Sequence, residues 1–495
     1  MSNDEAKCSV SSHEDMENLV DAEGGCMFKP TALALAVAFA FVLPANVHAQ
    51  DKPDLDQIRD QIKEIKESYE KRIEEFKQGY DKRIEALERR LEEAQSTATR
   101  AEQTAVAAKA VVPVSQPMGA QAGAGTFQLG LDILGIAGMS SVKNAELAKL
   151  QAGGHDPSRN GFTIQNVELT MSGAADPYFD AQANIVGLIN AQGQSQFELE
   201  EAYLTTRALP WGLQVKAGQS FLEFGRQNQQ HPHSWDFVDQ PIIMSRLFGA
   251  DGLRDQGARV SWLTPVPWYS ELYFGVYNAS GATVTSFLFD ESSRVGGYQL
   301  VPRDGARHTS DFLYLGRWLN GFDISTDTSL NAGISVLRGP NSTGTGAFTN
   351  IYGGDLYLKW RPPLNQRGFP FVGWQTEVMY RDYEAIDAAG IGLPNTTLKD
   401  WGYYTQVLWG FSPGLVAALR FDQANGNDPN GNAATDPFRD RRWRISPNLT
   451  WFPTEFSKLR LQYNHEDAAH LPDGKADSLW LQFEVGIGSH AAHKF

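Results

Sequence analysis

Short segments in which apolar and polar residues alternate recur along the chain from residue 126 onward. A period of two is typical of β-strands with one apolar and one polar face. The last segment is the clearest, because its polar face carries Gln482 and Glu484. Its apolar face carries Leu479, Leu481, Phe483, Val485 and Ile487. The same parity reaches the terminal Phe495, so we predict that residues 126–495 form an all-β domain.

Turn signals divide this domain into short and long connections. Short turns are expected at Ala175-Asp176-Pro177, Leu209-Pro210-Trp211-Gly212, Thr264–Trp268, Asn320-Gly321, Arg361–Gly368, Ser412-Pro413-Gly414 and Phe452-Pro453-Thr454. Longer polar or Gly-rich stretches lie at 142–160, 189–194, 222–252, 278–308, 338–348, 384–398, 423–440 and 465–476. Seven short turns and eight long loops join sixteen strands, which predicts a transmembrane barrel of about sixteen antiparallel strands. Fourteen and eighteen strands are the alternatives.

Aromatic residues flank the short turns. They are Trp211, Trp268, Tyr269, Phe369, Phe371, Phe411, Trp451 and Phe452. Such residues form girdles at the two membrane interfaces of a barrel. We therefore expect these aromatics to form the girdle on the periplasmic side.

A helical segment is expected before the barrel. Over residues 54–108, apolar positions recur at intervals of three and four, with mostly Glu, Lys, Arg and Gln between them. This spacing predicts an α-helical coiled coil within residues 51–110. A long apolar seam favours oligomerisation, and the alternative is a single helix that lies on the cell wall or on the barrel rim. Residues 111–125 are rich in Pro, Gly, Ala and Gln, which indicates a flexible linker.

The first 49 residues contain an export signal. Met27-Phe28-Lys29 is followed by an apolar run over Thr31–Leu43, and Val47 and Ala49 supply small residues before Gln50. This order predicts a secretory signal peptide over residues 27–49. Residues 1–26 are acidic and polar, so we interpret them as a misplaced start or an N-terminal extension.

Charge and cysteine content exclude several classes of protein. The chain has a formal net charge of −16, which does not suit a nucleic-acid-binding protein. Both cysteines, Cys8 and Cys26, precede the signal peptide, so the exported chain needs no disulfide framework. We find no nucleophile–base pair or phosphate loop in the barrel region. We therefore expect no enzyme activity and no cofactor.

The third long loop has an unusual composition. Residues 224–241 combine Arg226, His231, His233, Trp235 and Asp236. A polar, aromatic-bearing loop three hairpins into a barrel resembles the constriction loop that folds into the lumen of general porins. We therefore expect these five residues at the pore constriction.

The two histidines of this loop also suggest metal binding. Pro232 favours an extended backbone between His231 and His233, and Asp236 and Asp239 follow. Two imidazoles and a carboxylate suit zinc. The alternative is a loop fixed by hydrogen bonds and ring packing, so these histidines are candidate ligands and no metal site is assigned.

Basic residues alternate with apolar ones along several predicted strands. The set expected to face the lumen is Arg259, Lys359, Arg381, Arg420 and Arg444. A charge on the lipid face costs about 2–4 kcal/mol at mid-membrane, so such side chains point inward. Guanidinium groups pair with carboxylate and phosphate. We therefore expect a lumen that favours small hydrophilic anions.

The signal peptide, coiled coil, linker and sixteen-strand barrel that ends in Phe495 together resemble the DcaP-like trimeric porins. The resemblance implies a homo-oligomer, expected to be a trimer, in the lipid bilayer of a Gram-negative outer membrane, with the coiled coil in the periplasm. It implies passive diffusion of carboxylate-bearing solutes past a basic constriction, here assigned to Arg226, Arg259, Arg381, Arg420 and Arg444. A terminal Phe is also similar to the signal that the barrel assembly machinery recognises.

Two other functions stay open on the sequence. The coiled coil could tether the envelope, with the barrel as an anchor only. Metal-linked uptake of zinc through the loop that carries His231 and His233 is the second.

Overall fold

The computed structural model describes Lys63 and residues 127–151, 153–190, 192–289, 294–301, 306–427, 429 and 436–488. The predicted extension 1–26, the signal peptide 27–49 and the linker 111–125 lie outside the described residues. So do Phe495 and, apart from Lys63, the predicted coiled coil over 51–110.

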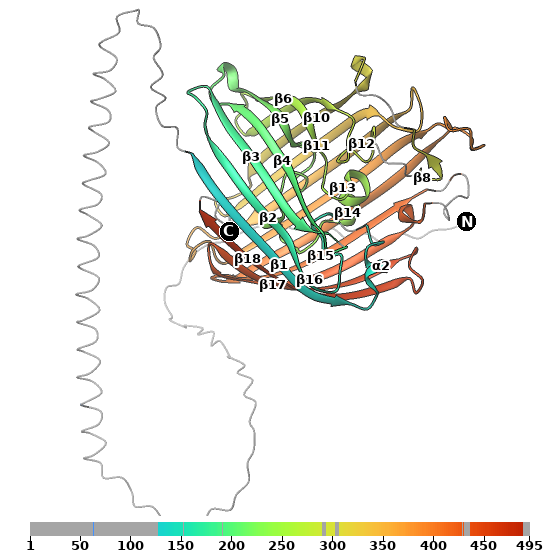
Figure 1. The fold of residues 1–495 in the computed structure, drawn as a ribbon. Helices are drawn as coiled ribbons and strands as arrows, with labels where there is room; N and C mark the ends of the chain where they lie inside the picture. Colours follow the sequence, from blue (N-terminus) through green and yellow to red (C-terminus); the bar gives the residue numbers. More distant parts are fainter. Residues whose placement is uncertain are drawn as a thin grey trace, which may run out of the picture. The chain divides into compact units, whose positions relative to one another are not determined.

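Sixteen antiparallel strands of the described chain close into a barrel, which confirms the predicted strand number (Figure 1). The first eight are β1 (Gln128–Ser140), β2 (Gly161–Ala174), β3 (Phe179–Ile189), β4 (Ser195–Thr206), β5 (Leu213–Phe221), β6 (Arg254–Leu263), β7 (Tyr269–Asn278) and β10 (Phe312–Asp323). The others are β11 (Thr328–Pro340), β12 (Phe348–Trp360), β13 (Phe371–Ala385), β14 (Thr396–Ser412), β15 (Leu415–Gly426), β16 (Arg442–Thr454), β17 (Ser457–Ala468) and β18 (Lys475–Gly488).

Small elements lie in the connections between the strands. They are α2 (Asn144–Leu147), α3 (Ile242–Phe248), the 3₁₀ turns η1 (Pro210–Gly212), η2 (Pro232–Ser234), η3 (Thr309–Asp311) and η5 (Pro437–Arg439), and the hairpin of β8 (Arg294–Val295) and β9 (Tyr298–Gln299). No helix among the described residues is long and apolar enough to cross a membrane.

The first and last strands pair with each other and close the ring. β1 and β18 run antiparallel with Leu131 opposite Ile487 and Ile133 opposite Val485, and they lie side by side in blue and red in Figure 1. Because every strand then has two neighbours, no sheet edge is left with unpaired N–H and C=O groups. Consecutive strands pair all the way round the ring, apart from the β8–β9 hairpin that lies outside it.

Alternate residues of each strand face opposite sides of the wall. On β13 the Val378 side chain is 54% exposed on the outer surface, whereas the preceding Glu377 is 1% exposed inside. The five apolar residues predicted to share one face of β18 are all exposed, and Gln482 and Glu484 are buried. Trp480 is an exception to the expected polarity, because it is buried on the inner face with Ile136 and Leu150.

One of the seven expected short turns was wrong. Asn320-Gly321 does not form a turn, because both residues pair within β10 and the chain reverses at 324–327. The Asn320 side chain accepts a hydrogen bond from the Trp268 indole at 3.1 Å. Glycine at 321 leaves room for the Tyr269 side chain, which would lie 3.3 Å from an added Cβ. Local turn propensity therefore yields to cross-strand packing.

The aromatic girdle is only partly as expected. Five of its members are exposed: Trp211, Trp268, Tyr269, Phe411 and Trp451. Phe369 and Phe371 instead pack with Val416 in a buried cluster, with Phe452 partly buried against it. These three aromatics therefore belong to a buried cluster rather than to the outer surface.

A charge placed on the outer wall is expected to destabilise the barrel. Val378→Arg replaces an exposed apolar side chain near the middle of β13 and should reduce the unfolding free energy in lipid vesicles by about 2–4 kcal/mol. The control is Ala389→Arg, in the exposed loop between β13 and β14, which should change it little. Equal effects of the two substitutions in urea titrations would show that the outer face is not in contact with lipid.

Candidate functional site

The third loop, residues 222–253 between β5 and β6, lies inside the barrel. Its backbone N–H groups reach strands that are far away in the sequence. Gln227 donates to Glu377 Oε1 of β13 at 2.7 Å, and Val238 donates to Gln462 Oε1 of β17 at 2.9 Å. Ile242 donates to Asp422 of β15. These bonds hold the loop across the lumen at several points.

A buried ionic cluster anchors the middle of the third loop. Asp239 pairs with Arg420 of β15 and lies 3.4 Å from Arg444 of β16. Arg420 also contacts Asp422 at 2.8 Å, and its guanidinium lies over the Phe237 ring. Burial alone would raise the pKa of Asp239, but Arg444 and Arg420 outweigh that effect and hold the pKa below its ordinary value. Two arginines predicted to line the lumen therefore fix the loop.

Two further predicted lumen arginines are also paired. Arg259 of β6 contacts Glu223 at 3.0 Å, and Arg381 of β13 contacts Asp400 at 2.6 Å. All four arginines point inward, where sequence parity places them. The alternation of residues along the strands did not indicate that each arginine would have a carboxylate partner. That partner neutralises most of the electric field of the arginine.

The part of the lumen beside α3 is filled by apolar side chains. Helix α3 contacts β14, β15 and β16. Its residues Ile243, Met244, Leu247 and Phe248 are buried in one cluster with apolar residues of the barrel wall. The wall residues include Tyr277, Leu313, Leu315, Leu337, Ile351, Met379 and Tyr404. An apolar core inside a barrel excludes water, so solutes have no path through this cluster.

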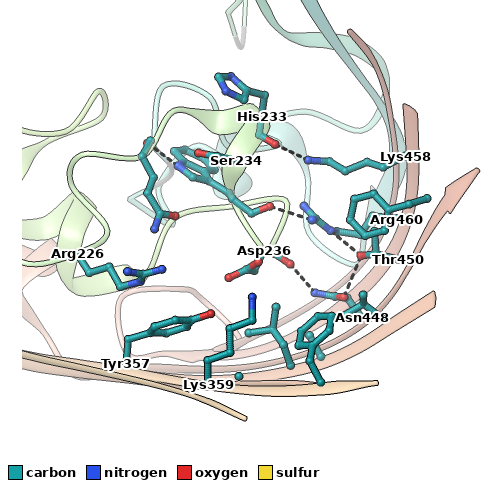
Figure 2. Close-up of a pocket in the computed structure, with 18 residues that line it drawn as sticks. Arg226, His233, Ser234, Asp236, Tyr357, Lys359, Asn448, Thr450, Lys458 and Arg460 are labelled. Atoms are coloured by element: carbon teal, nitrogen blue, oxygen red, sulfur yellow. Dashed lines mark hydrogen bonds between the residues drawn. The ribbon is translucent and has the colours of Figure 1, made fainter. Parts of the chain in front are cut away.

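A cavity of about 400 Å³ lies on the other side of the third loop, next to the short turns. It is lined by Arg226, Gln230, His233, Ser234, Trp235, Asp236, Tyr357, Lys359, Phe371, Gly373, Leu408, Val416, Ala418, Asn448, Thr450, Phe452, Lys458 and Arg460. Figure 2 shows that the loop residues form one wall of it and the strands the other.

Four cations and one carboxylate line this cavity, and the cations differ in their partners. Lys458 contacts Glu484 at 2.5 Å, and Arg460 donates to Thr450, Gln482 and the Trp235 carbonyl. Arg226 bonds to the Gln375 amide at 3.1 Å and stacks on the Tyr357 ring at 3.8 Å. Within the described part of the chain, no carboxylate lies within ion-pair distance of Arg226, Lys359 or Arg460, so only Lys458 is ion-paired.

Asp236 is the carboxylate of the cavity. Its Oδ2 accepts a hydrogen bond from Gln406 at 3.0 Å, and its backbone oxygen accepts one from Asn448. Figure 2 shows its carboxylate and the Lys359 ammonium pointing toward one another. Burial raises the pKa of Asp236 above its ordinary value, although Arg460 and Arg226 oppose the rise. The cavity is therefore cationic, and one acid opposes its field.

The histidines and Trp235 lie at the junction of the third loop with the wall. The His231 and His233 rings stack at 5.8 Å, and both contact Glu168 of β2. The Trp235 indole donates to the Gln230 carbonyl at 2.8 Å. Burial lowers the pKa of His231, but Glu168 and Glu200 outweigh this and hold the pKa well above its ordinary value.

The carboxylates beside the two histidines are therefore not those suggested by the sequence. Asp236 lines the cavity and Asp239 pairs with Arg420, whereas Glu168 and Glu200 come from the barrel wall. Sequence analysis also missed Lys458 and Tyr357 as cavity residues. Lys458 has the same parity as Arg460 on β17, so strand alternation was a usable signal.

No family model matches the chain. A protein of Aquifex aeolicus (strain VF5), described as an uncharacterized protein, is 31% identical over 376 residues, which cover 71% of this chain and 76% of that one.

Several solved structures are similar to the chain. The outer membrane channel DcaP of Acinetobacter baumannii is 12% identical with a TM-score of 0.49, and covers 75% of this chain and 100% of its own. The anion-selective porin from Comamonas acidovorans is 11% identical with a TM-score of 0.44, over 73% of this chain and 100% of its own. OprB of Pseudomonas putida is 8% identical with a TM-score of 0.46, over 73% and 94%.

Removing the Asp239 charge should destabilise the barrel strongly. Asp239→Asn leaves Asp422 as the one described acid within ion-pair distance of the buried Arg420 and Arg444, and should lower the unfolding free energy by about 3–5 kcal/mol. Asp467→Asn breaks the exposed pair with Arg441 and serves as the control, with an expected loss of about 1 kcal/mol or less. Comparable losses for both variants in urea unfolding would contradict an anchoring role for Asp239.

Proposed function

We propose that this chain, which belongs to the same family as the Aquifex aeolicus protein, is an outer-membrane porin, because its sixteen strands close into a barrel. It allows passive diffusion of small hydrophilic anions. The wall supports this proposal, since its outer face is apolar and its inner face carries the charged side chains. The third loop inside the lumen acts as the constriction.

The observation that carries anion preference is the charge of the cavity. Arg226, Lys359 and Arg460 face it without an ion-paired carboxylate among the described residues, while Lys458 is compensated by Glu484. A guanidinium on an aromatic ring and an ammonium beside it can bind carboxylate or phosphate groups weakly. Weak binding at such a site concentrates anions in the constriction and still releases them.

The setting proposed for this channel follows from the same architecture. The barrel lies in the outer membrane of a Gram-negative cell as a homo-oligomer, with three copies expected. The coiled coil over residues 51–110 stands in the periplasm, and Phe495 is the residue that the assembly machinery recognises. Native mass measurement of the detergent-purified protein, with and without residues 51–110, tests the subunit number and the role of the coiled coil.

Neutralising Arg226 and Lys359, two of the three cavity cations without an ion pair among the described residues, should weaken anion preference. A charge about 10 Å from an ion in a water-like medium contributes about 0.4 kcal/mol, or about a factor of two in permeability. Because an anion and a cation respond in opposite directions, each removed charge changes the anion-to-cation permeability ratio about fourfold, and the double variant Arg226→Gln with Lys359→Gln should lower it about 16-fold. The measurement is the reversal potential under a KCl gradient in planar bilayers.

The control for that measurement is Arg207→Gln, whose side chain is exposed in a short turn beside Asp180. It should leave the ratio near that of the wild type. Absence of conductance in the wild type would refute the porin proposal, and strong cation preference would refute the anion preference.

Protonation of Asp236 should increase anion preference. An ordinary Asp side chain has a pKa of about 3.9. Because burial raises the pKa of Asp236, this side chain loses its negative charge at a higher pH than an ordinary Asp does. The wild-type permeability ratio should therefore rise as pH falls through that pKa. Asp236→Asn should show the high ratio already at pH 7 and little dependence on pH over this range, measured again by reversal potential. A wild-type ratio that falls on acidification would show that Asp236 does not control the field.

A further inference from the structure

A compact group of imidazole and carboxylates lies where the third loop meets β2 and β4. His231 Nδ1 is 2.8 Å from Glu200 Oε2 and 3.1 Å from Glu168 Oε1. One ligand atom from each of these three residues lies within 4.8 Å of the others. The side chains of Glu168 and Glu200 are fully buried, at 0% and 1% exposure.

The ion-pair network around this group has an excess of negative charge. Among the described residues, its carboxylates are Glu168, Glu198, Glu200, Glu201 and Glu223. Its fixed cations are Lys216, Arg254 and Arg259. Five minus three leaves a charge of −2 when the imidazoles are neutral. Such a charge in a largely buried place needs compensation, either by protons on the histidines or by one divalent cation.

Without an ion, Glu168 and Glu200 outweigh the effect of burial and raise the pKa of His231, so protons supply part of the compensation and a divalent cation has to displace the proton on Nδ1. The geometry of His231 fits this exchange. Its Nε2 makes an aligned hydrogen bond with Glu201 Oε2 at 2.9 Å. Its Nδ1 has two carboxylate oxygens nearby but forms an aligned hydrogen bond with neither, and Glu200 Oε2 is likewise without a hydrogen bond. A protonated imidazole would donate from both nitrogens. A neutral imidazole that donates from Nε2 to a carboxylate directs the Nδ1 lone pair toward Glu168 and Glu200, as metal-bound histidines do.

We propose that Glu168, Glu200 and His231 bind one divalent first-row transition metal, with zinc as the representative ion. A tetrahedral ion with bonds of about 2.0–2.2 Å keeps its ligand atoms roughly 3.4 Å apart, so the three side chains need to separate only slightly. His233 donates from Nδ1 to the second oxygen of Glu168 at 3.0 Å and orients that ligand. The ion connects the third loop to strands β2 and β4.

A neighbouring group of His155, Glu198 and Glu200 is a weaker candidate. Arg254 contacts Glu198 at 2.5 Å and Glu200 Oε1 at 3.3 Å, so a fixed cation already occupies these carboxylates. Glu200 Oε2, on the other side of the same carboxylate, remains for the ion beside His231.

The ion is a structural part of the channel in this proposal and not its cargo. This role of the ion is separate from the proposed transport, because the ion holds the third loop in place. The assay below measures metal content alone, so a failure of ion conduction and a failure of metal binding are separate results.

The test uses the full chain purified in detergent, stripped with EDTA, incubated with zinc chloride at neutral pH and freed of excess metal by gel filtration. Mass spectrometry of the metal should find one zinc per wild-type chain. His231→Asn and Glu168→Gln should retain none. Glu201→Gln neutralises the outer partner of His231, which also contacts Lys216 and accepts the Phe221 N–H, and should weaken zinc binding roughly 10- to 100-fold. A wild-type chain without zinc, or equal zinc in His231→Asn, would overturn the proposal.

The matched control is His465→Asn, which removes a partly exposed imidazole that contacts Asp477 at 2.7 Å. It should keep one zinc per chain, and loss of zinc there would assign the metal to the wrong cluster. If circular dichroism shows that a ligand variant does not form strands, a measurement on the wild-type chain alone still tests the metal site. Co²⁺ should give the visible absorption of a four-coordinate site, saturate at one equivalent and be displaced by zinc, and its absence refutes the site.

Discussion

Closure of the ring by β1 and β18 is the constraint on which the rest of the structure depends. It pairs the backbone of every strand and leaves side chains only two directions, outward and inward. Charged residues on the strands therefore gather inside, where burial makes an unpaired charge costly. The third loop meets this requirement from within the lumen, because Asp239 and Glu223 lie beside Arg420, Arg444 and Arg259.

The need to pair buried charges also divides the lumen into two parts, which differ in how tightly they are packed and in how completely their charges are paired. Around α3, paired charges and closely packed apolar side chains fill the interior, which makes this part rigid. Beside the short turns, the pairing is incomplete, and Arg226 and Lys359 face a cavity next to the aromatic rings of Tyr357 and Phe371. Rigidity of the first part holds the second in shape, since both are built from one loop. The field that acts on a solute therefore depends on residues that the solute does not touch.

Much of the wall could be predicted from the sequence, because strand alternation is local. The strand number and the two faces of β18 followed from it. Asn320-Gly321 misled the prediction, since a local turn signal there is outweighed by the contacts of Trp268 and Tyr269. The partners inside the lumen were not predictable, because parity says that Glu168 or Arg444 points inward but not which loop residue meets it. Glu168 precedes His233 by 65 positions, so spacing within the third loop could not reveal it.

The third loop also bears on the order in which the molecule can form. Most of the wall is built from strands that are neighbours in the sequence, whose contacts close short loops. The bonds of Val238 to Gln462 and of Asp239 to Arg420 instead join positions 224 and 181 residues apart. Contacts of such high order are slow to form, because the entropy of closing a long loop is lost before they stabilise the chain. The interior of this barrel therefore acquires its final shape only after the C-terminal strands are in place, and a chain that lacks them has a lumen without its anchors.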